Sequence, residues 1–133
     1  MKRNYTRFAG KVVLVTGAGG GLGSVQVQLF AEEGATVVVA DISSDRGEAV
    51  AASIRGSGGQ ATFSEVNVTS AASWSALAER VRRDIGALHV LVNNAGIVSR
   101  TGVSAISQSE WQHVIDVNLT GPTLASTFLM SWS

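Results

Sequence analysis

The sequence predicts an α/β fold in which parallel strands alternate with helices in three layers, αβα. Three observations carry this prediction. Strand-like apolar segments alternate with segments of helical periodicity. The clearest strand segments are apolar throughout, as in a parallel sheet covered on both faces. A glycine-rich loop separates the first strand from the first helix. Right-handed crossovers then favour the strand order 3-2-1-4, with a ligand crevice at the carboxyl ends of strands one and four.

The first two strands and the helix between them have clear signals. Residues 11–16 contain the unbroken apolar run VVLV. A helix is expected at 22–33 and should end at Gly34, because glycine commonly terminates helices. A second β-branched strand is expected at 36–40, and Asp41 closes it.

The middle of the chain repeats this pattern. Residues 45–55 are expected to form a helix that ends at the glycine-rich segment 56–59, and residues 61–68 a weaker third strand. A helix is expected at 71–85, because apolar residues recur there at the 3.6-residue period. These residues are Trp74, Leu77, Val81 and Ile85.

The last expected elements are a fourth apolar strand at 88–92 and a final helix. The segment Ser107-Gln108-Ser109-Glu110 has the spacing of a capping box, so the helix should begin there. Its apolar residues are Trp111, Val114, Ile115 and Leu119. We expect Trp111, like Trp74, to lie in the core.

Composition limits the possible functions. A length of 133 residues suits one domain, and the formal net charge of zero gives no sign of a nucleic-acid or anionic-membrane partner. The chain has no cysteine, which excludes thiol chemistry, and no apolar run reaches the ~18 residues of a membrane span. Two isolated histidines, His89 and His113, predict no metal site. The basic start, residues 1–7, does not resemble a secretory signal, so a cytoplasmic protein is expected.

The loop after the first strand has the features of a phosphate-binding turn. It reads Thr16-Gly17-Ala18-Gly19-Gly20-Gly21-Leu22-Gly23. Gly17, Gly21 and Gly23 allow a tight turn, close approach of a phosphate and close packing of the helix on the strand. The alternative is an ordinary flexible turn. The strand before the loop and the helix after it favour a site for a dinucleotide pyrophosphate.

Asp41 lies 18 residues beyond Gly23, at the end of the second strand. A carboxylate there can accept hydrogen bonds from both adenosine ribose hydroxyls and would repel a 2′-phosphate. No arginine or lysine stands at Ser24 or Ile42 to bind such a phosphate. The alternative is a solvated cap for the helix that begins near Ser43. The spacing favours the ribose role and NAD over NADP.

Three ordered motifs resemble those of the short-chain dehydrogenase/reductase family. They are Thr16-Gly17-x-x-x-Gly21-x-Gly23, Asn93-Asn94-Ala95-Gly96 and Asp116-Val117-Asn118-Leu119-Thr120-Gly121. The resemblance extends from about Gly10 to Pro122. It implies a Rossmann fold, a nicotinamide cofactor and hydride transfer between an alcohol and a carbonyl.

The resemblance also implies which residues bind the cofactor. They are Thr16, Gly17, Gly19, Gly20, Gly21, Leu22, Gly23, Asp41, Asn67, Val68, Asn94, Ala95 and Gly96. Asn67 stands where the family usually has an aspartate beside the adenine, yet an asparagine can still accept from the exocyclic amine.

Asn118 resembles the family's catalytic asparagine, whose main-chain carbonyl holds a proton-relay water. Pro122 offers a physical reason beside the resemblance. It has no N–H, so in a helix it cannot bond the carbonyl four residues back, which belongs to Asn118. The alternative, that Pro122 simply kinks or ends the helix, is compatible with this role.

The family's catalytic serine and its Tyr-x-x-x-Lys motif have no counterpart here. The only tyrosine is Tyr5, and the only lysines are Lys2 and Lys11. We therefore expect one incomplete dinucleotide-binding domain over residues 1–133, truncated after about four βα units and inactive alone. An alcohol or carbonyl substrate would be used only with the missing half supplied. The alternatives are a non-catalytic NAD-binding module and an inactive product of an interrupted gene.

The same reasoning predicts a tendency to self-associate. The fourth strand has an interior composition but lacks a partner on one side, which exposes backbone groups along an apolar edge. The end of the last helix is also apolar. We expect part of its surface to be exposed through Phe128, Leu129, Met130 and Trp132. A homo-oligomer or an aggregate could form through these surfaces.

Overall fold

Four parallel strands form one sheet in the order β3-β2-β1-β4 within the described residues, 6–132, of this computed structural model. The strands are β1 (Val12–Thr16), β2 (Thr36–Asp41), β3 (Gln60–Glu65) and β4 (Val90–Val92). The predicted α/β class and strand order are confirmed. Tyr5, Lys2 and the rest of residues 1–5 lie outside the described part of the chain.

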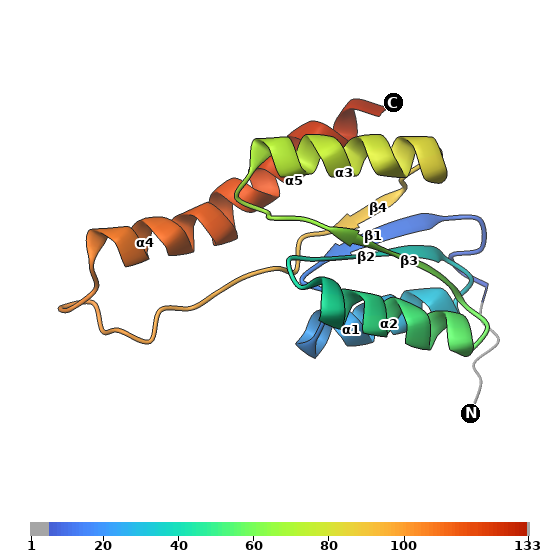
Figure 1. The fold of residues 1–133 in the computed structure, drawn as a ribbon, viewed down its shortest axis with the longest axis horizontal. Coiled ribbons are helices and arrows are strands. Elements are labelled where there is room, and N and C mark those ends of the chain that lie inside the picture. The colour runs from blue at the N-terminus through green and yellow to red at the C-terminus, as the bar shows by residue number, and fades with distance from the viewer. Residues whose placement is uncertain (1–5, 133) are drawn as a thin grey trace.

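Helices cover both faces of the sheet, as Figure 1 shows. On one face lie α1 (Gly21–Glu32) and α2 (Ser44–Gly56). On the other lie α3 (Ala71–Asp84) and α5 (Gly121–Leu129). Each crossover returns the chain to the same edge of the sheet, which brings the carboxyl ends of all four strands together.

Alternate residues of the central strands β1 and β2 pack into two different hydrophobic clusters, one on each face of the sheet. Val13 and Val15 of β1 pack on the face of α1 and α2, whereas Leu14 packs on the face of α3 and α5. All three are fully buried, and burial of each such side chain is worth about 1.5–3 kcal/mol. This two-sided burial explains why the strand sequences are apolar without alternation.

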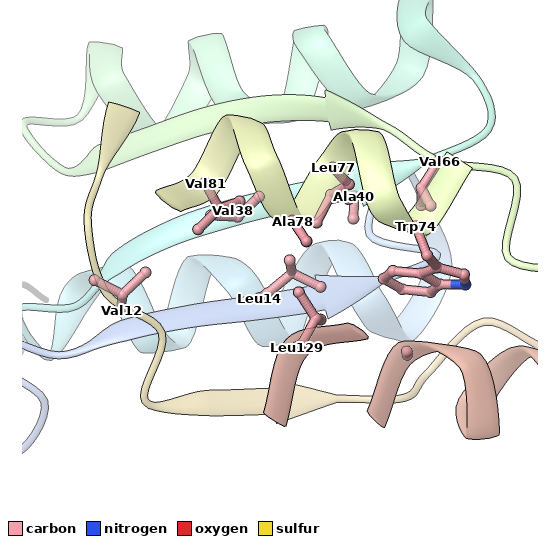
Figure 2. Close-up of a cluster of buried hydrophobic side chains, with 11 residues drawn as sticks. Val12, Leu14, Val38, Ala40, Val66, Trp74, Leu77, Ala78, Val81 and Leu129 are labelled. Carbon is pink, nitrogen blue, oxygen red and sulfur yellow. The ribbon is translucent and has the colours of Figure 1, made fainter. Parts of the chain in front are cut away.

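Trp74 anchors the core beneath α3. Figure 2 shows it beside Leu14 of β1, with Leu129 of α5 pointing toward the same strand. The indole is fully buried, and its Nε1–H donates to the Val68 carbonyl at 3.0 Å. The only polar atom of the ring is thereby satisfied inside an apolar cluster.

Two strands are shorter than expected, for local hydrogen-bonding reasons. β3 stops at Glu65 because the Asn67 side chain accepts from Thr69 N–H and turns the chain. β4 begins at Val90 because the ring of His89 takes part in the pairing: its Nδ1 accepts from Val12 N–H at 2.9 Å. At the start of the β1–β4 pairing, the His89 side chain thus accepts a hydrogen bond that a backbone carbonyl would otherwise accept.

The final helix departs most from the expectation. It consists of α4 (Gln108–Ile115), a π-helical turn (Asp116–Thr120) and α5. The Ser107 side chain caps α4 as predicted, accepting from Glu110 N–H at 3.1 Å. The other half of the capping box is missing, because the Glu110 carboxylate accepts from Ser99 Oγ instead.

For this region, the core position expected for Trp111 is wrong, and the exposure expected at the end of the last helix is wrong for Leu129 but confirmed for Met130. Trp111 is 56% exposed, because α4 extends away from the sheet and buries none of its residues (Figure 1). Leu129 is buried at 3% exposure, whereas the adjacent Met130 is 73% exposed. Helical periodicity marks an apolar face, but it does not say which surface covers that face.

Candidate functional site

The glycine-rich loop turns between β1 and α1 at the carboxyl edge of the sheet. Gly17 and Gly21 have φ angles of 64° and 52°, in the left-handed region that favours glycine. Gly23 is buried, and a Cβ there would collide with the Gly17 carbonyl oxygen. The loop therefore requires these glycines for its backbone path and for close packing of α1.

The N-terminus of α1 opens toward the cleft without a side-chain cap. Its N-cap residue is Gly20, in an extended conformation with no side-chain hydrogen bond. Gly17, Gly20 and Gly21 all line the cleft beside it. Free first-turn N–H groups and the helix dipole favour an anion at this position.

Asp41 is tied to the glycine loop by a direct hydrogen bond. Its Oδ2 accepts from Gly19 N–H at 2.9 Å, and its Oδ1 accepts from Ser43 N–H at 2.9 Å. Asp41 is only 7% exposed. Each oxygen still has a free lone pair, so the carboxylate can accept from two further donors in a fixed orientation.

Thr16 and Asn94 join the ends of β1 and β4. The Thr16 Oγ1 accepts from the N–H groups of Asn94 and Ala95 at 3.1 and 3.0 Å. The Asn94 Nδ2 donates to the Thr16 carbonyl at 3.1 Å. These contacts fix the crevice between the two strands, so both side chains act by positioning the backbone around it.

Asn118 fastens the segment after β4 to the π-helical turn. Its Oδ1 accepts from Ile97 N–H, and its Nδ2 donates to the Ile97 carbonyl. Within the turn, Gly121 N–H bonds the Asp116 carbonyl five residues back. This wider turn directly precedes Pro122, whose missing N–H interrupts the α-helical pattern.

These elements surround a cleft of about 600 Å³. It brings together eight of the residues expected to bind a cofactor, namely Gly17, Gly20, Gly21, Asp41, Asn67, Val68, Ala95 and Gly96. Thr16, Gly19, Gly23 and Asn94 lie behind this lining, in the contacts described above. Leu22 is 68% exposed and, like Asn118, does not line the cleft.

The cleft also contains two basic side chains that sequence reasoning did not place there. Arg46, in the first turn of α2, lies with its Cβ about 3.2 Å from the position that a Cβ on Gly19 would occupy. His113 of α4 also lines the cleft. The position of Arg46 could have been inferred, because the first turn of a helix directly after Asp41 must lie beside the same strand end.

Other kinds of site find no support in the part of the chain that the structure describes. No three His, Asp or Glu side chains within residues 6–132 are grouped so that they could hold a metal ion. No helix in the same range is both long enough and apolar enough to span a bilayer.

Comparisons with known proteins agree with this geometry. A family model described as short chain dehydrogenase matches residues 11–131. The 2,5-dichloro-2,5-cyclohexadiene-1,4-diol dehydrogenase LinX of Sphingobium indicum is 42% identical over 114 residues, covering 86% of this chain and 46% of that protein. The 3-alpha-(or 20-beta)-hydroxysteroid dehydrogenase of Mycobacterium tuberculosis is 42% identical over 115 residues, covering 86% of this chain and 43% of that protein.

Solved structures give the same result. A short chain dehydrogenase from Mycobacterium smegmatis superposes with a TM-score of 0.92 at 34% identity, covering 97% of this chain and 55% of that one. A gluconate 5-dehydrogenase from Burkholderia cenocepacia, in complex with NADP and tartrate, has a TM-score of 0.89 at 29% identity, with 96% and 50% coverage. The chain spans about half the length of the relatives it matches.

Proposed function

This chain belongs to the short-chain dehydrogenase family, and on that premise we propose that its cleft binds NAD as a hydride-transfer cofactor. The bound nicotinamide would accept or supply the hydride that interconverts an alcohol and a carbonyl. The residues of this chain would bind and orient the dinucleotide at the carboxyl edge of the sheet.

One observation carries this proposal: the bond of 2.9 Å between Asp41 Oδ2 and Gly19 N–H. It holds a carboxylate with free lone pairs beside a glycine loop and an uncapped helix N-terminus. The loop and helix supply N–H donors for a pyrophosphate, and the carboxylate supplies acceptors for two ribose hydroxyls. The residues therefore fit the adenosine diphosphate part of a dinucleotide.

The same carboxylate favours NAD over NADP. A 2′-phosphate would lie against a buried negative charge, which raises the free energy of binding. Arg46 also lines the cleft, and its positive charge would offset part of this repulsion. We therefore propose that the cleft binds NAD more tightly than NADP but can still bind NADP.

Asn118 is proposed to act through its main-chain carbonyl, which would hold a water in a proton relay. Pro122 supports this role because it removes the N–H that would bond that carbonyl in a regular α-helix. The acid/base pair of the family, Tyr-x-x-x-Lys, does not occur in these 133 residues. For this chain alone we therefore propose cofactor binding without turnover.

A non-catalytic NAD-binding module is the second candidate function. It is favoured because the sequence combines the glycine loop and Asp41 with a single tyrosine, Tyr5. This tyrosine precedes the start of β1 at Val12 by seven residues and is not part of a Tyr-x-x-x-Lys motif. The two candidates differ in whether hydride chemistry occurs when residues outside this sequence complete the site. Both require that the chain bind NAD.

Calorimetric titration of the 133-residue chain with NAD and NADP tests the proposal. We expect NAD to bind more tightly than NADP. In a parallel assay, a panel of secondary alcohols should give no multiple-turnover reduction of NAD. Tighter binding of NADP would contradict the role of Asp41, and the absence of binding to either dinucleotide would contradict the cofactor site itself.

Self-association is proposed to involve β4 and α4. The residues of β4 are only half-buried, and this strand has one partner, β1, in the described sheet. Trp111 of α4 and Leu119 of the adjoining π-helical turn expose 56% and 62% of their surfaces. An unpaired apolar strand edge and exposed large apolar side chains each favour association with a second copy.

A further inference from the structure

The Asn67 side chain has its acceptor already in use. Its Oδ1 accepts from Thr69 N–H at 3.1 Å and from the Thr69 hydroxyl at 2.7 Å. An amide oxygen has two lone pairs, so these two donors occupy both of them. The Thr69 N–H also fixes the assignment of the amide, because only the oxygen can accept from it.

The other end of the same amide remains available. The Asn67 Nδ2 makes no hydrogen bond to any of residues 6–132, and Asn67 is an exposed residue of the cleft lining. Its two N–H groups can only donate. A ligand that reaches Asn67 therefore meets a donor, although the sequence alone suggested an acceptor.

The topology indicates which part of a dinucleotide reaches this position. A pyrophosphate at the glycine loop lies at the end of β1, and a ribose at Asp41 lies at the end of β2. The next strand outward is β3, paired with β2 through Asp41 and Glu65, and Asn67 lies two residues beyond its end. Neighbouring strands lie about 4.8 Å apart, so a base attached to that ribose would extend to the end of β3.

Resting on the function proposed above, we propose that Asn67 meets the purine of a bound dinucleotide as a hydrogen-bond donor, so that the cleft accepts a 6-oxopurine as well as adenine. Position 6 of adenine carries an amine, which donates and would face another donor. Position 6 of hypoxanthine carries a carbonyl, which accepts from Nδ2. Position 1 also differs, because the adenine nitrogen accepts whereas the hypoxanthine N–H donates. Nδ2 still finds an acceptor on each base, N1 or N7 in adenine and the carbonyl oxygen or N7 in hypoxanthine, so neither base is excluded.

The test compares NAD with nicotinamide hypoxanthine dinucleotide, which differs only in the base. The measured quantity is the ratio of their two Kd values for the same protein. This ratio does not change if a substitution lowers the fraction of folded chain or the overall affinity for anions. For the native chain we expect the two Kd values to agree within about twofold. The binding free energies of the two dinucleotides should differ by less than the contribution of one net hydrogen bond.

Asn67→Asp provides the decisive variant. A carboxylate keeps one oxygen for Thr69 and places a second acceptor where Nδ2 was. At position 6 it should accept from the adenine amine and repel the hypoxanthine carbonyl. Because the neighbouring N1–H of hypoxanthine can donate to the carboxylate and offset part of this repulsion, we expect the ratio to shift about 3-fold toward NAD, the lower end of one net hydrogen bond. Ser70→Asp is the matched control, because it adds the same charge nearby and aspartate can still cap α3 in place of Ser70. It should leave the ratio unchanged.

Thr69→Val supplies an independent variant. It removes the hydroxyl donor and keeps the N–H, which frees one lone pair on Asn67 Oδ1. The ratio should shift toward NAD by less than in Asn67→Asp. A native chain that already prefers NAD several-fold, or an unchanged ratio in Asn67→Asp, would overturn the inference and leave the cofactor site standing. Failure of both dinucleotides to bind would overturn the proposed function, and this inference with it.

Discussion

Asn118 and Ile97 are hydrogen-bonded to each other twice, with both bonds at 2.8 Å. The amide oxygen of Asn118 accepts from the Ile97 N–H, and the amide nitrogen donates to the Ile97 carbonyl. Twenty-one residues separate the two positions. The pair therefore closes the long segment between β4 and the π-helical turn, and it holds one wall of the cleft at Gly96 and Ile97.

Replacing Asn118 with alanine should loosen that wall. Both backbone groups of Ile97 would lose their partner, and because they are exposed to water the cost should be about 1 kcal/mol. Urea unfolding measures the loss of stability, and amide hydrogen exchange should show faster exchange at Ile97. Thr120→Ala, at an exposed residue of the same π-helical turn, is the control and should change neither. Unchanged exchange at Ile97 in Asn118→Ala would show that the segment is held by other contacts.

Replacing Asp41 with asparagine should narrow the preference for NAD over NADP. Asparagine keeps an acceptor for Gly19 or Ser43 but removes the negative charge and one set of lone pairs. NAD affinity should fall about 10-fold, since hydrogen bonds to charged groups contribute about 1.5–3 kcal/mol. NADP affinity should fall less or rise. Calorimetry on the native chain and on Asp41→Asn gives the ratio of the NAD and NADP affinities for each protein. An equal loss of affinity for the two dinucleotides would exclude a ribose role for Asp41.

Replacing His89 with alanine should destabilise the β1–β4 edge. The Val12 N–H donates to His89 Nδ1 at 2.9 Å and would be left without an acceptor. The expected loss is about 1 kcal/mol for this part-buried donor. His89→Asn is the matched control, because its Oδ1 can accept in place of Nδ1 and should restore most of the stability. If His89→Ala unfolds at the same urea concentration as the native chain, the imidazole acceptor does not stabilise the edge.

Gly47 allows α2 to lie directly on β3. A Cβ at this position would overlap the ring of Phe63. Gly47→Ala should therefore cost about 1–3 kcal/mol through overpacking. Gly56→Ala, in the last residue of the same helix with no neighbouring atom within 4 Å, should be neutral or stabilising by up to about 1 kcal/mol. Thermal unfolding separates the two, and equal melting temperatures would mean that Phe63 moves aside without cost.

Trp111→Gln should reduce self-association of the chain. Trp111 is 56% exposed on α4, a helix that buries none of its residues. Removing this aromatic surface lowers the apolar area available for contact between copies. Static light scattering over a concentration series measures the change, and Gln112→Ala, on an exposed neighbour, serves as the control. A native chain that stays monomeric at high concentration and melts sharply would show that β4 and α4 need no partner.

The order of residues is enough to predict the layers of this fold and the position of the cleft. Apolar strand segments that alternate with amphipathic ones favour a parallel sheet covered by helices, because the central strands bury both faces and the crossovers are right-handed. The glycines and Asp41 then had to meet at the carboxyl edge. These features depend on local pattern and on chirality, both of which the order of residues contains.

Which side-chain atoms remain free for a ligand could not be predicted from local pattern, because it depends on contacts between elements. The sequence identified Asn67 as an acceptor, but Thr69 occupies its oxygen and leaves the nitrogen for a ligand. It placed Trp111 in the core, but no layer of the described structure covers α4. Arg46 lines the cleft because α2 packs beside Gly19. The free hydrogen-bonding atoms and the burial of a side chain depend on the residues that surround it. Those surroundings are set by the packing of whole helices and strands and not by the residue itself.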